Sequence, residues 1–230
     1  MDIQEENVFF ASETLALAGR LAYDAGLAAT SAKVLICPPH PFLGGDMENN
    51  VVRQLHLTLA AAGFMAFCFN YRGIGQSESD RDLQQEQRLF WENSTCPDYE
   101  ACIHDDCRAA LQWLEPAWTA DTPVHLVGYS FGCLPALSLS RQQPIQRLAL
   151  ISPPLTQWTI TKEQVSTPLP RALFFATGDF ACPETDIETL YAQMPEPKSL
   201  ARFVDSDHFF IGQETQLAEA VCRFLVSADD

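Results

Sequence analysis

The chain has 230 residues, 47% of them hydrophobic and 19% charged, a composition that excludes a disordered chain and favours a globular one with a substantial core. Its formal net charge of −16 disfavours binding to nucleic-acid phosphates or anionic lipids, and its longest apolar run, Leu59–Phe69, is too short to span a bilayer. The acidic segment Met1–Asn7 lacks the basic start of a secretory signal, so we expect a cytoplasmic protein.

Apolar segments alternate with amphipathic ones along the chain. The predicted strands are Val8–Ala11, Gly19–Tyr23, Lys33–Cys37, Phe64–Phe69, Val124–Gly128, Leu148–Ser152, Ala172–Thr177 and Leu200–Val204. The predicted helices are Asn49–Ala62, Asp98–Trp118, Phe131–Arg141, Glu184–Gln193 and Gln213–Val226. This order predicts a single α/β domain over residues 1–230, with an eight-stranded, mostly parallel sheet, an antiparallel first edge and helices on both faces.

Two segments interrupt the alternation. Asp80–Pro97 and Pro153–Pro170 are longer than ordinary connections, and they carry the aromatic residues Trp91 and Trp158. Two interpretations stay open: the segments form a small cap over a site, or they are surface excursions whose aromatic side chains pack inward.

The segment Gly128-Tyr129-Ser130-Phe131-Gly132 has the pattern G-x-S-x-G between a predicted strand and a predicted helix. A nucleophile on a sharp strand-to-helix turn needs small neighbours, because larger side chains would collide across the turn. The turn also sets the hydroxyl at a helix N-terminus, where backbone N–H groups favour developing negative charge. The pattern therefore predicts that Ser130 is a nucleophile.

Three further loops carry recognisable patterns. His40–Met47 resembles an H-P-x-x-G-G-x-M loop, Asn70–Ser77 an N-x-R-G-x-G-x-S loop, and Asp207–Phe210 a D-H-F-F segment. With the Ser130 turn, the chain resembles the small, esterase-like serine-hydrolase branch of the α/β-hydrolase superfamily over nearly its whole length. The resemblance implies an α/β-hydrolase fold with a minimal cap, and it implies that the D-H-F-F histidine, His208, is catalytic.

The position of His208 also supports its role as the base. A serine hydroxyl is a weak nucleophile unless a base takes its proton. His208 follows the last predicted strand on a short loop, from which it can reach Ser130 across the strand ends. The histidines elsewhere lie in predicted helices or in the strand before Ser130, except His40, which we interpret as a loop-structuring residue with a second base as the alternative.

The acid is expected after the strand Ala172–Thr177. Relatives commonly show G-x-x-D-x-x-x-P there, and counting four residues back from Pro183 gives Asp179. Counting three residues on from Gly178 gives Ala181, which has no carboxylate, so the two registers disagree. We predict Asp179 as the acid, and the alternatives are Glu184, Asp186, Asp205 and Asp207.

An oxyanion needs two N–H donors. Phe131, the residue after the nucleophile, is predicted to supply one, and the loop after the third strand is predicted to supply the other through Phe42, with Leu43 next. In that loop Pro38 replaces a histidine that is common in the family. We predict that Leu43, Trp91 and Trp158 line the substrate pocket.

The expected reaction is hydrolysis of a carboxylic ester or thioester, with a small acyl compound as the partner and no cofactor. The alternatives are an acyltransferase or peptidase with the same three residues, or a binding protein that has lost catalysis. The eight cysteines are expected to be mostly buried thiols, and the spacing of Cys102 and Cys107 matches no common zinc pattern, so we predict no metal. A homodimer is compatible with these features.

Overall fold

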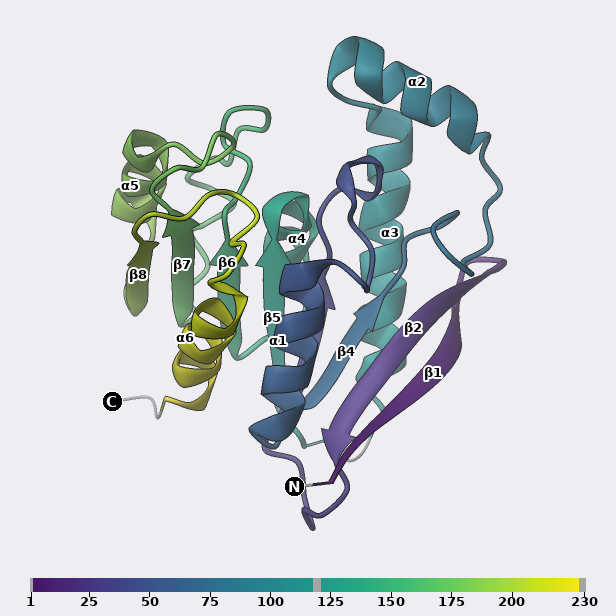
Figure 1. The fold of residues 1–230 in the computed structure, drawn as a ribbon, viewed down its shortest axis with the longest axis vertical. Coiled ribbons are helices and arrows are strands. Elements are labelled where there is room, and N and C mark those ends of the chain that lie inside the picture. Colours follow the sequence, from purple (N-terminus) through teal and green to yellow (C-terminus); the bar gives the residue numbers. More distant parts are fainter. Residues whose placement is uncertain (1, 118–120, 228–230) are drawn as a thin grey trace.

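A computed structural model describes residues 2–117 and 121–227 and contains one eight-stranded sheet, in the order β1-β2-β4-β3-β5-β6-β7-β8 (Figure 1). The strands are β1 (Ile3–Ser12), β2 (Leu15–Asp24), β3 (Lys33–Cys37), β4 (Met65–Phe69), β5 (Val124–Tyr129), β6 (Arg147–Ile151), β7 (Arg171–Ala176) and β8 (Lys198–Phe203). β2 pairs antiparallel with β1 and with β4, and the pairs from β4 to β8 are parallel. The predicted mostly parallel sheet with an antiparallel edge is confirmed.

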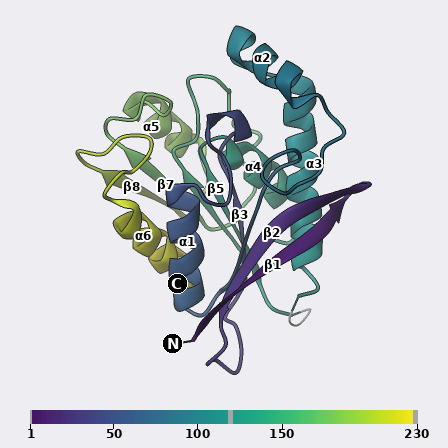
Figure 2. The ribbon, with the colours of Figure 1, turned by 45° about the vertical axis from the view of Figure 1, so that its right-hand side comes forward.

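Helices cover both faces of the sheet, and each face has its own hydrophobic core. Helices α1 (Asn50–Ala61) and α6 (Glu214–Val226) pack side by side on one face (Figures 1 and 2). Helices α3 (Pro97–Leu114), α4 (Cys133–Gln142) and α5 (Glu184–Gln193) cover the other. The central strands, buried along their whole length, are apolar without alternation because both of their faces are covered.

One helix was not predicted. Helix α2 (Leu83–Asn93) occupies most of the first long segment and lies above the end of α3 (Figure 2). Asp82 begins it by accepting hydrogen bonds from the backbone N–H groups of Gln84 and Gln85, at 3.1 and 3.2 Å. The sequence of α2 is mostly polar, and Phe90 is its only fully buried apolar residue, so the segment lacks the apolar content of the helices that were predicted.

The other helices lie close to their predicted bounds. The segment predicted as Asp98–Trp118 begins at Pro97 and ends at Leu114, and Trp118 lies outside the described residues. The second long segment, between Ile151 and Arg171, contains no helix or strand. Within the described ranges, no helix combines the length and the apolar character needed to cross a membrane.

A buried ion pair joins three parts of the fold. Asp106 of α3 accepts hydrogen bonds from Arg72 Nη2 at 2.7 Å, from the Arg72 backbone N–H at 3.0 Å and from Ser12 Oγ at 2.8 Å. Asp106→Asn is expected to lower the free energy of unfolding by about 3 kcal/mol, because a buried guanidinium loses its main counter-charge. Urea unfolding of the purified variant measures this loss.

The matched control is Asp105→Asn. Asp105 neighbours Asp106 in sequence, but its side chain is 40% exposed, and it pairs with Arg108 on the helix surface at 2.8 Å. An exposed pair of this kind contributes less than about 1 kcal/mol. Equal losses in the two variants would contradict the structural role of the buried pair.

Candidate active site

Ser130 lies on the sharp turn between β5 and α4. Its backbone is left-handed, with φ of 52°, which a residue other than glycine adopts only under strain. A Cβ on Gly128 would lie 2.6 Å from the carbonyl oxygen of Gly132, and one on Gly132 would lie 2.1 Å from that of Cys37. Both positions therefore require glycine, and the turn packs directly against the loop that follows β3.

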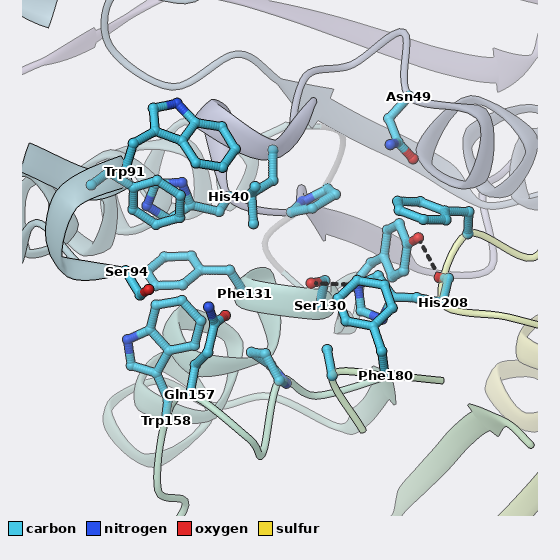
Figure 3. Close-up of a pocket in the computed structure, with 17 residues that line it drawn as sticks. His40, Asn49, Trp91, Ser94, Ser130, Phe131, Gln157, Trp158, Phe180 and His208 are labelled. Atoms are coloured by element: carbon cyan, nitrogen blue, oxygen red, sulfur yellow. Dashed lines mark hydrogen bonds between the residues drawn. The ribbon is translucent and has the colours of Figure 1, made fainter. Parts of the chain in front are cut away.

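Three predicted residues meet at the carboxyl edge of the sheet, although they are far apart in the sequence. Ser130 Oγ lies 3.0 Å from His208 Nε2 (Figure 3). His208 Nδ1 lies 2.8 Å from Asp179 Oδ1 and 3.0 Å from Asp179 Oδ2. Ser130 follows β5, Asp179 follows β7 and His208 follows β8. Because these strands are parallel, the loops after them lie at one edge, where sites of α/β proteins form.

The surroundings of Asp179 favour its charged form. Its Oδ1 accepts hydrogen bonds from the backbone N–H groups of Ala181 at 2.8 Å and Cys182 at 3.0 Å. Burial alone would raise the pKa of Asp179, but the hydrogen bond and charge of His208 and the Ala181 N–H outweigh it and lower the pKa. The loop that carries His208 is held by Tyr129, whose hydroxyl donates to the His208 carbonyl oxygen at 2.7 Å.

The alternative acids are directed elsewhere. Glu184 forms an ion pair with Arg202, and Asp207 accepts a hydrogen bond from the backbone N–H of Phe209 at 3.0 Å. Among the described residues, Asp179 is the carboxylate in hydrogen-bond contact with the His208 ring.

The loop after β3 differs from its prediction. It forms a short 3-10 turn, Pro41–Leu43, in which the Phe42 N–H donates to His40 Nδ1 at 3.2 Å and the Leu43 N–H to the His40 carbonyl oxygen at 2.9 Å. Both N–H groups are thus engaged within the loop, a geometry that does not favour Phe42 or Leu43 as an oxyanion donor, and their predicted role stays a prediction. The Phe42 ring points away from the cavity and stacks on Tyr99, with ring centroids 4.9 Å apart.

His40 is a fully buried loop residue rather than a second base. Burial lowers its pKa to about 3, so the ring is neutral, and Nδ1 is an acceptor for the Phe42 N–H. The proton must therefore sit on Nε2, which faces Cys96 Sγ and Glu100 Oε1, each at 3.9 Å.

His40, Cys96 and Glu100 form a compact group whose ligand atoms all lie within 4.8 Å of one another. Burial raises the pKa of the Cys96 thiol to about 12. The contacts of His40 with Cys96 and Glu100 connect the loop after β3 to α3.

A cavity of about 230 Å³ opens beside Ser130. The predicted pocket residues Leu43, Trp91 and Trp158 all line it, and Phe131 lines it as well. The lining residues that the sequence did not single out include Asn49, Ser94, Gln157, Phe180 and Phe209. Two of these had a signal in the sequence, since Phe180 directly follows Asp179 and Phe209 directly follows His208.

Both long segments contribute to this cavity. Phe90 and Trp158 pack inward, whereas the Trp91 side chain stays exposed at the rim. The two interpretations of these segments therefore combine: they form a minimal cover over one side of the cavity, and part of their aromatic content packs into the core.

Comparisons with known proteins agree with this architecture. A family model for the alpha/beta hydrolase fold matches residues 43–212. An uncharacterized protein of Rickettsia prowazekii is 26% identical over 204 residues, which cover 84% of this chain and 78% of that one. An alpha-beta serine hydrolase homologue from Coxiella burnetii superimposes with a TM-score of 0.80 at 24% identity, over 96% of this chain and 97% of the other. A serine hydrolase without a lid from Xanthomonas campestris gives 0.77 at 20% identity, over 98% and 97%.

Proposed function

The chain belongs to the alpha/beta-hydrolase fold family, and from this we propose that it is a serine hydrolase that cleaves a carboxylic ester or thioester through an acyl-enzyme. The single observation that carries the proposal is the unbroken hydrogen-bonded series from Ser130 through His208 to Asp179. A nucleophile, a base and an orienting carboxylate at these distances are what acyl transfer requires.

The proposed reaction has two halves. In the first, His208 Nε2 takes the Ser130 proton while Oγ bonds to the acyl carbon, and the intermediate then collapses as His208 returns the proton to the departing oxygen or sulfur. In the second, His208 takes a proton from water, whose oxygen attacks the Ser130 ester, and the acid leaves as Oγ regains its proton. Asp179 holds the imidazole in the tautomer that leaves Nε2 free to accept.

We propose the backbone N–H groups of Phe131 and His40 as the oxyanion donors. Phe131 directly follows the nucleophile at the start of α4. In the segment 38–43 the three prolines have no N–H group. The N–H groups of Phe42 and Leu43 donate to His40. The His40 N–H remains, and His40 lines the cavity beside Ser130.

The test is turnover of p-nitrophenyl esters together with labelling by a fluorophosphonate probe, with the labelled residue identified by peptide mass spectrometry. A serine hydrolase is expected to turn over short esters and to carry the label on Ser130. A binding protein without catalysis would show neither. An acyltransferase would transfer the acyl group to added alcohols in preference to water.

Trp158 is expected to set the affinity for apolar acyl groups. Its ring packs on Phe131 with centroids 5.2 Å apart, and its Nε1 donates to Glu100 Oε2 at 3.4 Å. Trp158→Ala is expected to lower kcat/KM for p-nitrophenyl butyrate about tenfold or more, because roughly 1.5 kcal/mol or more of apolar contact is lost. Initial-rate kinetics with the acetate and butyrate esters measure the effect.

The control is Trp158→Phe, which keeps an apolar ring, although a smaller one, and removes the indole N–H that bonds to Glu100. We expect it to retain most of the preference for butyrate over acetate. If Trp158→Ala lowers kcat/KM equally for both esters, the residue supports the fold of the site and does not contact the acyl group.

A further inference from the structure

The cavity extends to both sides of Ser130, and the two sides differ in their lining (Figure 3). We infer, on the basis of the proposed function, that the substrate is an ester or thioester in which both the acyl group and the leaving group are uncharged and apolar. In this inference the acyl group lies on the Trp158 side, and the leaving group lies between Phe180 and Phe209.

The chemistry assigns the leaving group to one side. In the proposed reaction His208 gives its proton to the departing atom, so the leaving group must lie next to the imidazole. The rings beside that imidazole are Phe180, with centroids 5.1 Å apart, and Phe209, at 5.6 Å. These side chains are 67% and 44% exposed, so they present apolar surface at the mouth of the cavity.

The acyl group then lies on the side of the cavity opposite the imidazole. In Figure 3 the labelled residues Trp91, Ser94, Phe131, Gln157 and Trp158 lie across Ser130 from His208 and Phe180. The buried Phe131 ring contacts Trp158 edge-on. Ser94 and Gln157 add neutral polar groups, so this compartment offers contact surface to an apolar chain and no counter-ion to a charged one.

The lining carries no fixed cation for an anionic substrate. Among the described residues that line the cavity there is no lysine, arginine, aspartate or glutamate. Of its two histidines, His40 is neutral, and the His208 ring is already bonded to Asp179. A phosphate or carboxylate on either side would lose water without gaining a charged partner.

The residues just outside the cavity add negative charge on the leaving-group side. Asp207 precedes His208, and Glu214 connects through Asn50 to the Phe209 carbonyl oxygen, with both contacts from Asn50 Nδ2 at 2.9 Å. The pKa of Tyr129, which lines the cavity, is raised by burial and further by carboxylates that include Asp207 and Glu214. This arrangement repels an anionic carrier such as coenzyme A.

The experiment compares two thioesters that share the same reacting end. Butyryl-N-acetylcysteamine ends in the same cysteamine unit as butyryl-coenzyme A and lacks its phosphates. We expect kcat/KM for the neutral thioester to exceed that for butyryl-coenzyme A by about a hundredfold at low ionic strength, with the ratio falling as salt screens the repulsion.

A charge-gain variant sharpens the test. Phe180→Lys places a cation beside the departing sulfur and is expected to raise the butyryl-coenzyme A rate relative to the neutral thioester about tenfold. Val226→Lys adds the same charge at the far end of α6, on an exposed position outside the cavity, and should change the ratio little.

The outcomes separate this inference from the proposed function. If p-nitrophenyl butyrate is turned over and butyryl-coenzyme A is cleaved as fast as the neutral thioester or faster, the inference is overturned and the proposed function stands. If no ester or thioester is cleaved and the fluorophosphonate leaves Ser130 unlabelled, the proposed function fails and the inference fails with it.

Discussion

Ser130→Ala is expected to lower kcat for p-nitrophenyl esters by about four to six powers of ten. The substitution removes only Oγ, the atom that lies 3.0 Å from His208 Nε2 and that would form the acyl bond. It keeps the left-handed backbone at φ of 52°, so the same strain remains and the turn should persist. Single-turnover and steady-state rates of the purified variant measure the loss.

The control for this variant is Ser138→Ala. Ser138 lies on α4, two turns after the nucleophile, and its Oγ accepts a hydrogen bond from Gln142 Nε2 at 3.3 Å on the helix surface. We expect full activity and full fluorophosphonate labelling in this control, and neither in Ser130→Ala. Comparable turnover in the two variants would show that another group is the nucleophile.

Asp179→Asn is expected to lower kcat by about four powers of ten. Asp179 Oδ1 is held by two backbone N–H groups, those of Ala181 and Cys182, and this favours the amide oxygen of asparagine at the same place. The amide NH₂ then takes the place of Oδ2, 3.0 Å from His208 Nδ1. A donor there forces the imidazole proton onto Nε2, which can no longer accept the Ser130 proton.

The controls are Glu184→Gln and Asp186→Asn, which change two nearby carboxylates that do not contact His208. Both are expected to keep nearly normal activity. If either of them is as impaired as Asp179→Asn, or if Asp179→Asn turns over normally, the assignment of the acid is wrong.

The pH dependence of stability gives a second readout for Asp179. Because the folded state holds its pKa below the usual value of 3.8, the ionised carboxylate stabilises the fold above that pH. The stability difference between wild type and Asp179→Asn should therefore be complete at neutral pH and shrink as the pH falls through the lowered pKa. Urea unfolding across this range measures it, and a difference that stays constant down to the lowest pH would contradict a stabilising role of the ionised carboxylate.

Several features of this protein follow from short stretches of sequence. The central strands can be predicted from the sequence because burial on both faces of the sheet requires unbroken apolar runs. The turn at Ser130 can be predicted because Gly128 and Gly132 flank it. A Cβ atom at either position would collide with the backbone of the turn or of the neighbouring loop. Counting back from Pro183 predicts Asp179 as the acid. The role of Asp179 beside Ser130 and His208 is a proposal that rests on its contact with His208.

The oxyanion loop and the pocket depended instead on contacts between distant segments. A sequence pattern locates a loop but does not say where each N–H points. Position in the sequence favours the Phe42 N–H as an oxyanion donor, but in the structure this N–H donates to the His40 ring. Helix α2 is mostly polar in sequence, and its packing on the rest of the fold through Phe90 and Leu83 is visible only in the structure. The apolar walls beside His208 arise when β7 and β8 bring Phe180 and Phe209 together, 6.0 Å apart between ring centroids, and that proximity exists only in the folded sheet.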